Sequence, residues 1–136
     1  MSGPGATTRV FVYGSLLRGQ PNHRCLSGAD FVGVVRTGRG FTLYDLGAFP
    51  GMVASGRGQV RGELYAVDER ILRALDRLEG HPVFYRRQLV VLEGGETAET
   101  YLLRPDQVVG RRVVRSGDWK AWCARKDGRP DEDRDA

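Results

Sequence analysis

The sequence predicts an α+β fold, a small mixed β-barrel with one main helix packed beside it. Short apolar segments separated by glycine-rich turns recur along most of the 136 residues. One segment, residues 68–80, combines helical periodicity with capping residues at both ends. A single helix among many short strands favours a sheet that curls on itself beside that helix.

The strands are predicted from bulky and β-branched residues that alternate between turn residues. The first spans residues 9–13 and follows a flexible leader at 1–8. Further strands are expected at 31–36 and 41–46, a short extended piece at 51–54, and a longer strand at 58–67. Segments 85–92 and 96–103 flank Gly94 and Gly95, which is typical of a hairpin. Residues 125–136, of mixed charge, are expected to form a disordered tail.

The helix prediction depends on residues at the two ends of the segment. Asp68 suits the N-cap, and Glu69 suits the first turn, where the helix dipole favours an anion. Gly80 is typical of the position just after a helix, and Pro82 prevents its continuation.

Glu79 is the one charged residue on the apolar face of that helix. At about 100° per residue, the other charged side chains fall on the opposite face. Glu79 falls among Ile71, Leu72, Ala74, Leu75 and Leu78. Burial without a partner raises the pKa of a carboxyl group toward neutrality, as a general base requires. The alternative is a carboxylate in a frayed last turn that swings into water.

A second candidate site follows the first strand, in the segment FVYGSLLRGQP at 11–21. Gly14 and Ser15 interrupt apolar residues there. Such a turn can leave consecutive N–H groups pointing at an anion, commonly a carboxylate or phosphate, and glycine permits close approach of the ligand. A plain turn is the alternative, and the segment does not match a P-loop.

Composition argues against several classes of protein. The net charge is +4, but the arginines are scattered without interleaved aromatic residues, so nucleic-acid binding is not expected. No apolar run approaches the roughly 18 residues of a transmembrane helix, and no signal peptide is recognisable, so we expect no membrane partner and a cytoplasmic location. Cys25 and Cys123 are far apart, and His23 and His81 lack metal-ligand spacing, so no metal or cofactor is expected.

Several segments, in their order and spacing, resemble the gamma-glutamylcyclotransferase-like family, which includes gamma-glutamylamine cyclotransferase. These are VFVYGSLLRGQPNH, LYDLGAFPGMV, GQVRGELYAVDERILRALDRLEGHPVFYRR, YLL at 101–103 and SGDW, and together they span residues 9–119. The resemblance implies a single domain, placed at 9–124, with the barrel and helix described above. GQPNH is similar to the gamma-glutamylamine branch of the family.

The resemblance also implies an activity. The α-amine of a γ-glutamyl substrate attacks its own γ-carbonyl, which gives 5-oxoproline and releases an amine or amino acid without a cofactor. The family's catalytic glutamate matches Glu79. Its substrate-binding residues match Tyr13, Gly14, Ser15, Leu16, Tyr85 and Tyr101. Two alternatives stay open: a non-catalytic binder of a carboxylate-bearing small molecule on the same fold, and a nucleic-acid-binding barrel. Neither the leaving amine nor the oligomeric state is indicated.

Overall fold

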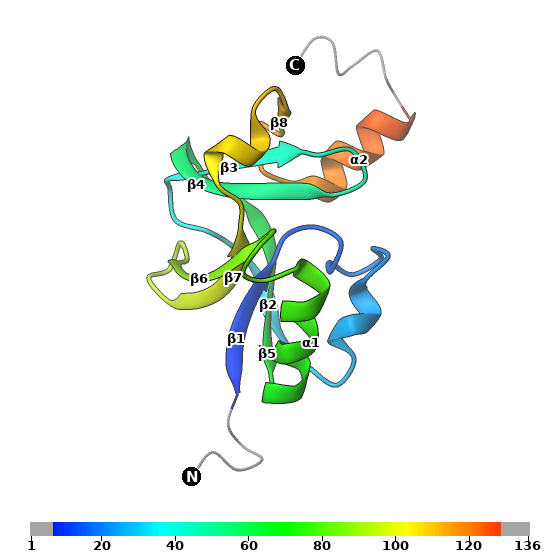
Figure 1. Cartoon of the computed structure of the whole chain (residues 1–136), viewed down its shortest axis with the longest axis vertical. Coiled ribbons are helices and arrows are strands. Elements are labelled where there is room, and N and C mark those ends of the chain that lie inside the picture. The colour runs from blue at the N-terminus through cyan, green and yellow to red at the C-terminus, as the bar shows by residue number, and fades with distance from the viewer. Residues whose placement is uncertain (1–6, 129–136) are drawn as a thin grey trace.

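The computed structural model describes residues 7–128, and within them it contains an eight-stranded sheet and two α-helices (Figure 1). The strands are β1 Thr8–Val12, β2 Asp30–Arg36, β3 Phe41–Asp45, β4 Pro50–Gly58, β5 Arg61–Val67, β6 Arg86–Val91, β7 Thr97–Leu102 and β8 Arg112–Val113. The helices are α1 Glu69–Glu79 and α2 Trp119–Gly128, and two 3-10 helices are η1 His23–Leu26 and η2 Pro105–Val108.

The sheet is mixed, and it confirms the predicted α+β class. Its strand order is β2-β5-β1-β7-β4-β3-β8, with β6 paired to β7 beside that path. Strand β7 runs parallel to both β1 and β4, and the other pairings are antiparallel. In Figure 1, β3, β4 and β8 lie with α2 at one end of the molecule, and β1, β2 and β5 lie with α1 at the other.

The predicted closure of the barrel is wrong. Closure needs a continuous hydrogen-bonded ladder between the end strands. Here β2 and β8 stand at opposite ends of the strand path, and no ladder among the described residues joins them. A single bridge, between Thr37 after β2 and Leu92 after β6, is the link from β2 to the β6–β7 hairpin.

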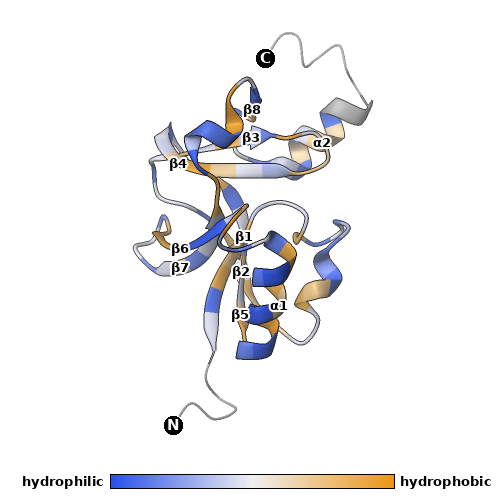
Figure 2. Cartoon of the chain, viewed as in Figure 1, coloured by the Kyte–Doolittle hydropathy of each residue, from blue (hydrophilic) through white to orange (hydrophobic). Residues whose placement is uncertain are grey.

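Helix α1 has the predicted caps. The Asp68 carboxylate accepts a hydrogen bond of 2.8 Å from the N–H of Ile71, and Gly80 adopts the left-handed conformation with φ 68°. Figure 2 shows that α1 carries both polar and apolar residues, as expected of a helix packed on one side. Leu78, expected on the buried face, is instead 42% exposed, and it lines a cavity rather than the core.

Helix α2 was not predicted from the sequence. The structure therefore has two helices beside the sheet, where one main helix was expected. The carboxylate of Asp118 accepts a hydrogen bond of 3.2 Å from the N–H of Ala121 at its start. Trp119 and Trp122 are each 3% exposed, and the indole N–H of Trp122 donates to the Asp45 carboxylate at 2.8 Å. The helix thus buries both tryptophans against the sheet.

Several boundaries differ from those predicted. Strand β4 is longer than the piece expected at 51–54, because a bulge opposite Phe41 and Thr42 lets the strand continue to Gly58. Strand β5 consequently begins at Arg61 rather than at residue 58. The predicted leader overlaps β1 at Thr8, and the predicted tail overlaps α2 at 125–128. Residues 1–6 and 129–136 lie outside the described residues.

Candidate active site

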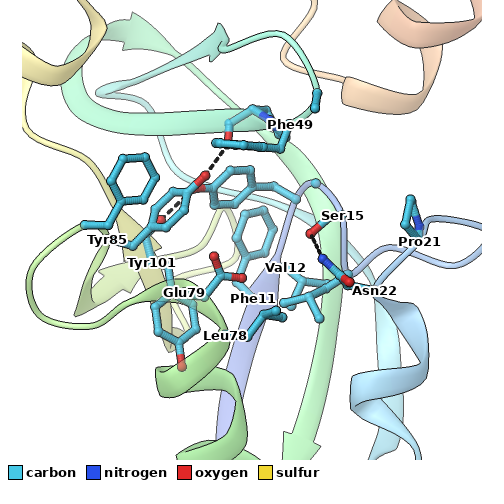
Figure 3. Close-up of a pocket in the computed structure, with 16 residues that line it drawn as sticks. Phe11, Val12, Ser15, Pro21, Asn22, Phe49, Leu78, Glu79, Tyr85 and Tyr101 are labelled. Carbon is cyan, nitrogen blue, oxygen red and sulfur yellow. Dashed lines mark hydrogen bonds between the residues drawn. The ribbon is translucent and has the colours of Figure 1, made fainter.

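A cavity of about 450 Å³ lies where the C-terminal end of α1 meets the segment after β1 and the start of β4 (Figure 3). All seven residues that the sequence singled out line this cavity: Tyr13, Gly14, Ser15, Leu16, Glu79, Tyr85 and Tyr101. The chain fold therefore brings together residues that are up to 88 positions apart. The remaining lining residues are Phe11, Val12, Pro21, Asn22, Ala48, Phe49, Pro50, Leu78 and Phe84.

Glu79 is the last residue of α1, and its half-buried carboxylate points into the cavity (Figure 3). Within the described part of the chain, no side chain forms a hydrogen bond or ion pair with this carboxylate. Burial therefore acts without compensation and raises the pKa of Glu79 from 4.5 to about 7. The group can exchange a proton near neutral pH.

Three tyrosine rings bury Glu79 but direct their hydroxyl protons elsewhere. The Tyr13 hydroxyl donates to the carbonyl oxygen of Tyr101 at 2.6 Å and accepts from the N–H of Met52 at 3.2 Å. The Tyr85 hydroxyl donates to the carbonyl oxygen of Pro50 at 2.7 Å. The Tyr101 hydroxyl donates to the carboxylate of Asp76 at 2.7 Å. The tyrosines therefore exclude water from Glu79 without stabilising its charged form.

Burial also keeps the tyrosines themselves neutral. It raises the pKa of Tyr13 well above the ordinary value, and the nearby Tyr85 and Glu79 add to this effect. Burial is again the main reason that the pKa of Tyr85 is raised, with Glu79 second. The rings thus act as apolar walls with no negative charge of their own.

The segment after β1 forms a tight loop that leaves N–H groups available. The N–H of Leu17 donates to the carbonyl oxygen of Gly14 at 3.0 Å, which closes the turn. Asn22 anchors Ser15 twice, because its N–H donates to the Ser15 carbonyl at 2.9 Å and its side-chain amide to the Ser15 hydroxyl at 3.1 Å. The N–H groups of Ser15 and Leu16 have no acceptor among the described residues. This arrangement suits an anion.

Gly14 is required by packing at the same loop. A Cβ atom at this position would lie 2.5 Å from Cγ of Pro50, well inside van der Waals contact. The glycine therefore lets the loop approach the start of β4, where Phe49 and Pro50 form the opposite wall of the cavity.

The sequence did not single out several residues that line the cavity. Asn22 lies in GQPNH and Phe49 in LYDLGAFPGMV, two segments that carry the family resemblance, but nothing in either pattern marked these side chains. Phe84 makes edge-to-face contacts with Phe49 and Tyr85, with ring centres 6.2 and 5.0 Å apart. Such contacts join segments that are distant along the chain and cannot be read from periodicity.

Neither histidine lines the cavity. Nδ1 of His23 lies 3.0 Å from the carbonyl oxygen of Leu16, and Nδ1 of His81 accepts a hydrogen bond of 3.0 Å from the N–H of Arg87. Among residues 7–128, no three potential metal ligands gather at one point. No helix in that range has the length and apolar character needed to span a bilayer.

Residues 10–121 match the family described as gamma-glutamyl cyclotransferase, AIG2-like. A candidate gamma-glutamylcyclotransferase of Vibrio cholerae is 43% identical over 110 residues, which cover 81% of this chain and 93% of that protein.

Two solved structures are also similar. The solution structure of YtfP from Escherichia coli is 38% identical, with a TM-score of 0.64 over 82% of this chain and 95% of that one. The crystal structure of an AIG2-like protein from mouse is 34% identical, with a TM-score of 0.62 over 71% of this chain and 76% of that one.

Proposed function

Because the chain belongs to the gamma-glutamyl cyclotransferase, AIG2-like family, we propose that it converts a γ-glutamyl amine into 5-oxoproline and a free amine. The observation that carries this proposal is Glu79, a carboxylate in the cavity that has a pKa of about 7 and no hydrogen-bond or ion-pair partner among residues 7–128. An unpaired base at this pH suits a reaction that must deprotonate an amine.

The loop after β1 would hold the substrate by its α-carboxylate. The free N–H groups of Ser15 and Leu16 supply donors for one carboxylate, and they need no counter-charge. With the α-carboxylate held there, the γ-glutamyl chain would extend along the cavity toward Glu79. Positioning one chain so that its ends meet is what favours an intramolecular cyclisation.

The proposed reaction begins when Glu79 takes a proton from the substrate's α-ammonium group. The freed nitrogen lone pair attacks the γ-carbonyl carbon, forming the new C–N bond of a five-membered ring. The attack leaves an oxyanion on the former carbonyl and a positively charged ring nitrogen that still carries two hydrogens. Glu79 passes its first proton to the leaving nitrogen and then takes the second proton from the ring nitrogen. As the oxyanion re-forms the carbonyl, the bond from that carbon to the leaving nitrogen breaks, and Glu79 gives the second proton to the departing amine, which leaves as an ammonium ion. One ammonium group is consumed and one is formed, so atoms and charge balance and Glu79 is regenerated.

The raised pKa of Glu79 favours the first step. Each pKa unit corresponds to about 1.4 kcal/mol, so a rise from 4.5 to about 7 makes the proton transfer about 3 kcal/mol less uphill. Whatever the pKa of the amine, a rise from 4.5 to about 7 corresponds to a factor of roughly 300 in the population of the reactive form.

The lining of the cavity favours a leaving amine that carries no carboxylate. Glu79 is the one charged side chain among the lining residues, so a second anionic group on the substrate would be buried without a cation. The wall formed by Phe49, Phe84 and Leu78 is apolar and suits an aliphatic or aromatic amine. We therefore expect γ-glutamyl amines to be preferred over γ-glutamyl amino acids.

The test is a panel of γ-glutamyl compounds incubated with purified protein and scored for 5-oxoproline. γ-Glutamyl butylamide and γ-glutamyl benzylamide should react faster than γ-glutamyl glycine, and the Glu79→Gln variant should be inactive on all three. Binding of these compounds without 5-oxoproline from any of them would instead favour a non-catalytic binding protein on this fold.

A further inference from the structure

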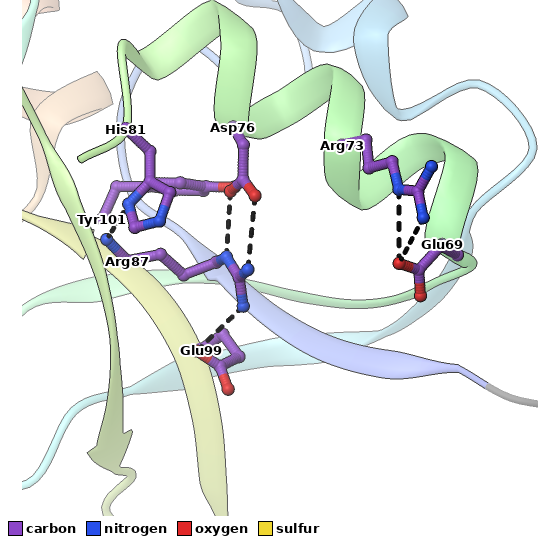
Figure 4. A network of polar contacts seen from close by, with 7 residues as sticks. All are labelled: Glu69, Arg73, Asp76, His81, Arg87, Glu99 and Tyr101. Atoms are coloured by element: carbon purple, nitrogen blue, oxygen red, sulfur yellow. Dashed lines mark hydrogen bonds and ion pairs between the residues drawn. The ribbon is translucent and has the colours of Figure 1, made fainter.

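Glu63 is a buried carboxylate that the proposed reaction does not use. It lies on β5, within the segment GELY at 62–65, and only 6% of it is exposed. A carboxylate taken out of water ordinarily needs a cation beside it. Asp76 of α1 has such a partner in Arg87, whose Nε and Nη2 donate to it at 2.9 and 3.2 Å (Figure 4). The hydrogen-bond partners of Glu63 among residues 7–128 are instead neutral groups.

One of these neutral partners belongs to the loop after β1. Oε1 of Glu63 accepts a hydrogen bond of 3.0 Å from the main-chain N–H of Arg18 and one of 2.9 Å from the Tyr65 hydroxyl. The bond to Tyr65 stays within β5, whereas the bond to Arg18 joins β5 to the loop. A charged acceptor binds an N–H more strongly than a neutral one does. The bond to Arg18 therefore fixes the main chain at the end of the loop.

Glu63 also stands beside the start of the same loop. In the antiparallel pairing of β1 with β5 it lies opposite Val12, the last residue of β1. One residue of β5 thus meets both ends of the loop, through strand pairing at Val12 and through its side chain at Arg18. Between these two points lie the N–H groups of Ser15 and Leu16, which have no acceptor among the described residues.

The carboxylate of Glu63 lies outside the candidate active site. Glu63 lines a smaller cavity of about 220 Å³ together with Leu17, and it does not line the larger cavity into which Glu79 points. It therefore makes no contact with a substrate in the larger cavity, and its bond to Arg18 can act only through the loop. The side chain of Arg18 has a contact of its own, because its guanidinium lies 3.8 Å from the centre of the Phe31 ring.

Resting on the proposed carboxylate site at Ser15 and Leu16, we propose that Glu63 is a positioning residue that holds the loop after β1 in the shape that binds the substrate's α-carboxylate. Without this acceptor, the part-buried N–H of Arg18 is left unpaired, which costs free energy. The loop recovers that free energy by turning the N–H toward water or another acceptor. Such a turn displaces the neighbouring donors and weakens binding of the carboxylate.

The test is steady-state kinetics of 5-oxoproline formation from γ-glutamyl butylamide. Glu63→Met replaces the carboxylate with an apolar group of similar length, and it should raise KM about tenfold, the size expected when a hydrogen bond to a charged group is lost. The value of kcat should be retained, because the loop binds substrate and transition state alike. Glu63→Gln keeps an oxygen that accepts from Arg18 and should return KM close to the wild-type value. A general loss of stability would instead reduce the active fraction and leave KM unchanged.

Two control variants keep the bond between Glu63 and the Arg18 N–H. Tyr65→Phe removes the other bond to Glu63, and Arg18→Ala removes the stacking on Phe31, so both should leave KM near the wild-type value. The proposal is overturned if Glu63→Met leaves KM unchanged, if Glu63→Gln raises KM as much as Glu63→Met, or if Arg18→Ala alone gives the full rise. Should Glu63→Met fail to fold, adding Tyr65→Phe removes the hydroxyl left without an acceptor, and the double variant should show the same rise in KM.

A binding measurement separates this proposal from the proposed function. Calorimetry with γ-glutamyl butylamide in a Glu79→Gln background reports binding without turnover, and Glu63→Met should weaken that binding about tenfold. This result supports the positioning role even if the wild-type protein forms no 5-oxoproline. Conversely, 5-oxoproline formation with a KM that Glu63→Met leaves unchanged supports the enzyme and overturns the positioning role.

Discussion

Replacing Glu79 by glutamine should stabilise the protein above neutral pH and abolish its activity. The folded state holds the proton of Glu79 more tightly than the unfolded chain, because burial raises the pKa from 4.5 to about 7. Ionised Glu79 therefore destabilises the folded state. This penalty is absent below pH 4.5, grows between pH 4.5 and 7, and is constant above that range.

The size of the effect follows from the same two pKa values. A difference between 4.5 and about 7 corresponds to about 3 kcal/mol in the free energy of unfolding, an upper value because the carboxylate is partly exposed. Glu79→Gln cannot ionise, so its stability relative to the wild type should increase by up to this amount between pH 4.5 and pH 8.

The measurement is urea unfolding of both proteins at pH 4.5, 6 and 8, with 5-oxoproline formation assayed in parallel. The matched control is Glu69→Gln, on the same helix, whose side chain is 74% exposed and pairs with Arg73. It should change stability little at any of these pH values. A stability difference between wild type and Glu79→Gln that is constant across the pH range would refute the assignment of Glu79 as a desolvated carboxylate.

Four further outcomes are expected. The rate of 5-oxoproline formation should fall as pH drops through about 7, because protonated Glu79 cannot accept a proton; a pH–rate profile checks this. Gly14→Val should abolish substrate binding in calorimetry, since a Cβ at Gly14 already meets Pro50 at 2.5 Å. Ser15→Ala should raise KM several-fold by removing the side-chain bond from Asn22, with kcat retained. Tyr85→Phe should lower kcat in steady-state assays with the fold intact by circular dichroism, because its bond to the Pro50 carbonyl orients the cavity wall.

Much of the fold and of the candidate site follows from local sequence patterns. Helix α1 was predictable because its capping residues, Asp68 and Gly80, act within one turn of the chain. The polar turn at Gly14 and Ser15 and the misplaced charge of Glu79 are also local departures from a regular pattern. The segments that resemble the family then supplied Tyr85 and Tyr101, and all these residues line one cavity.

Helix α2 was missed, although its segment of the sequence contains local signals of a helix. Asp118 followed by Trp119, Trp122 and Cys123 has a capping residue and apolar residues at helical spacing. The element is short, and its two tryptophans are stabilised by burial against the sheet rather than by propensity. A segment this short can be assigned to a helix only when the sheet surface on which it packs is known.

The sequence by itself determined the class of the fold, the caps of α1, the loop after β1 and the identity of the candidate base. Tertiary structure alone decided that the sheet stays open, that Asp76 is covered by Arg87 and Tyr101, and that three tyrosine hydroxyls donate away from Glu79. The physical reason is range. Capping and periodicity act between residues a few positions apart, whereas desolvation and competition for a hydrogen bond depend on groups that only the folded chain brings together.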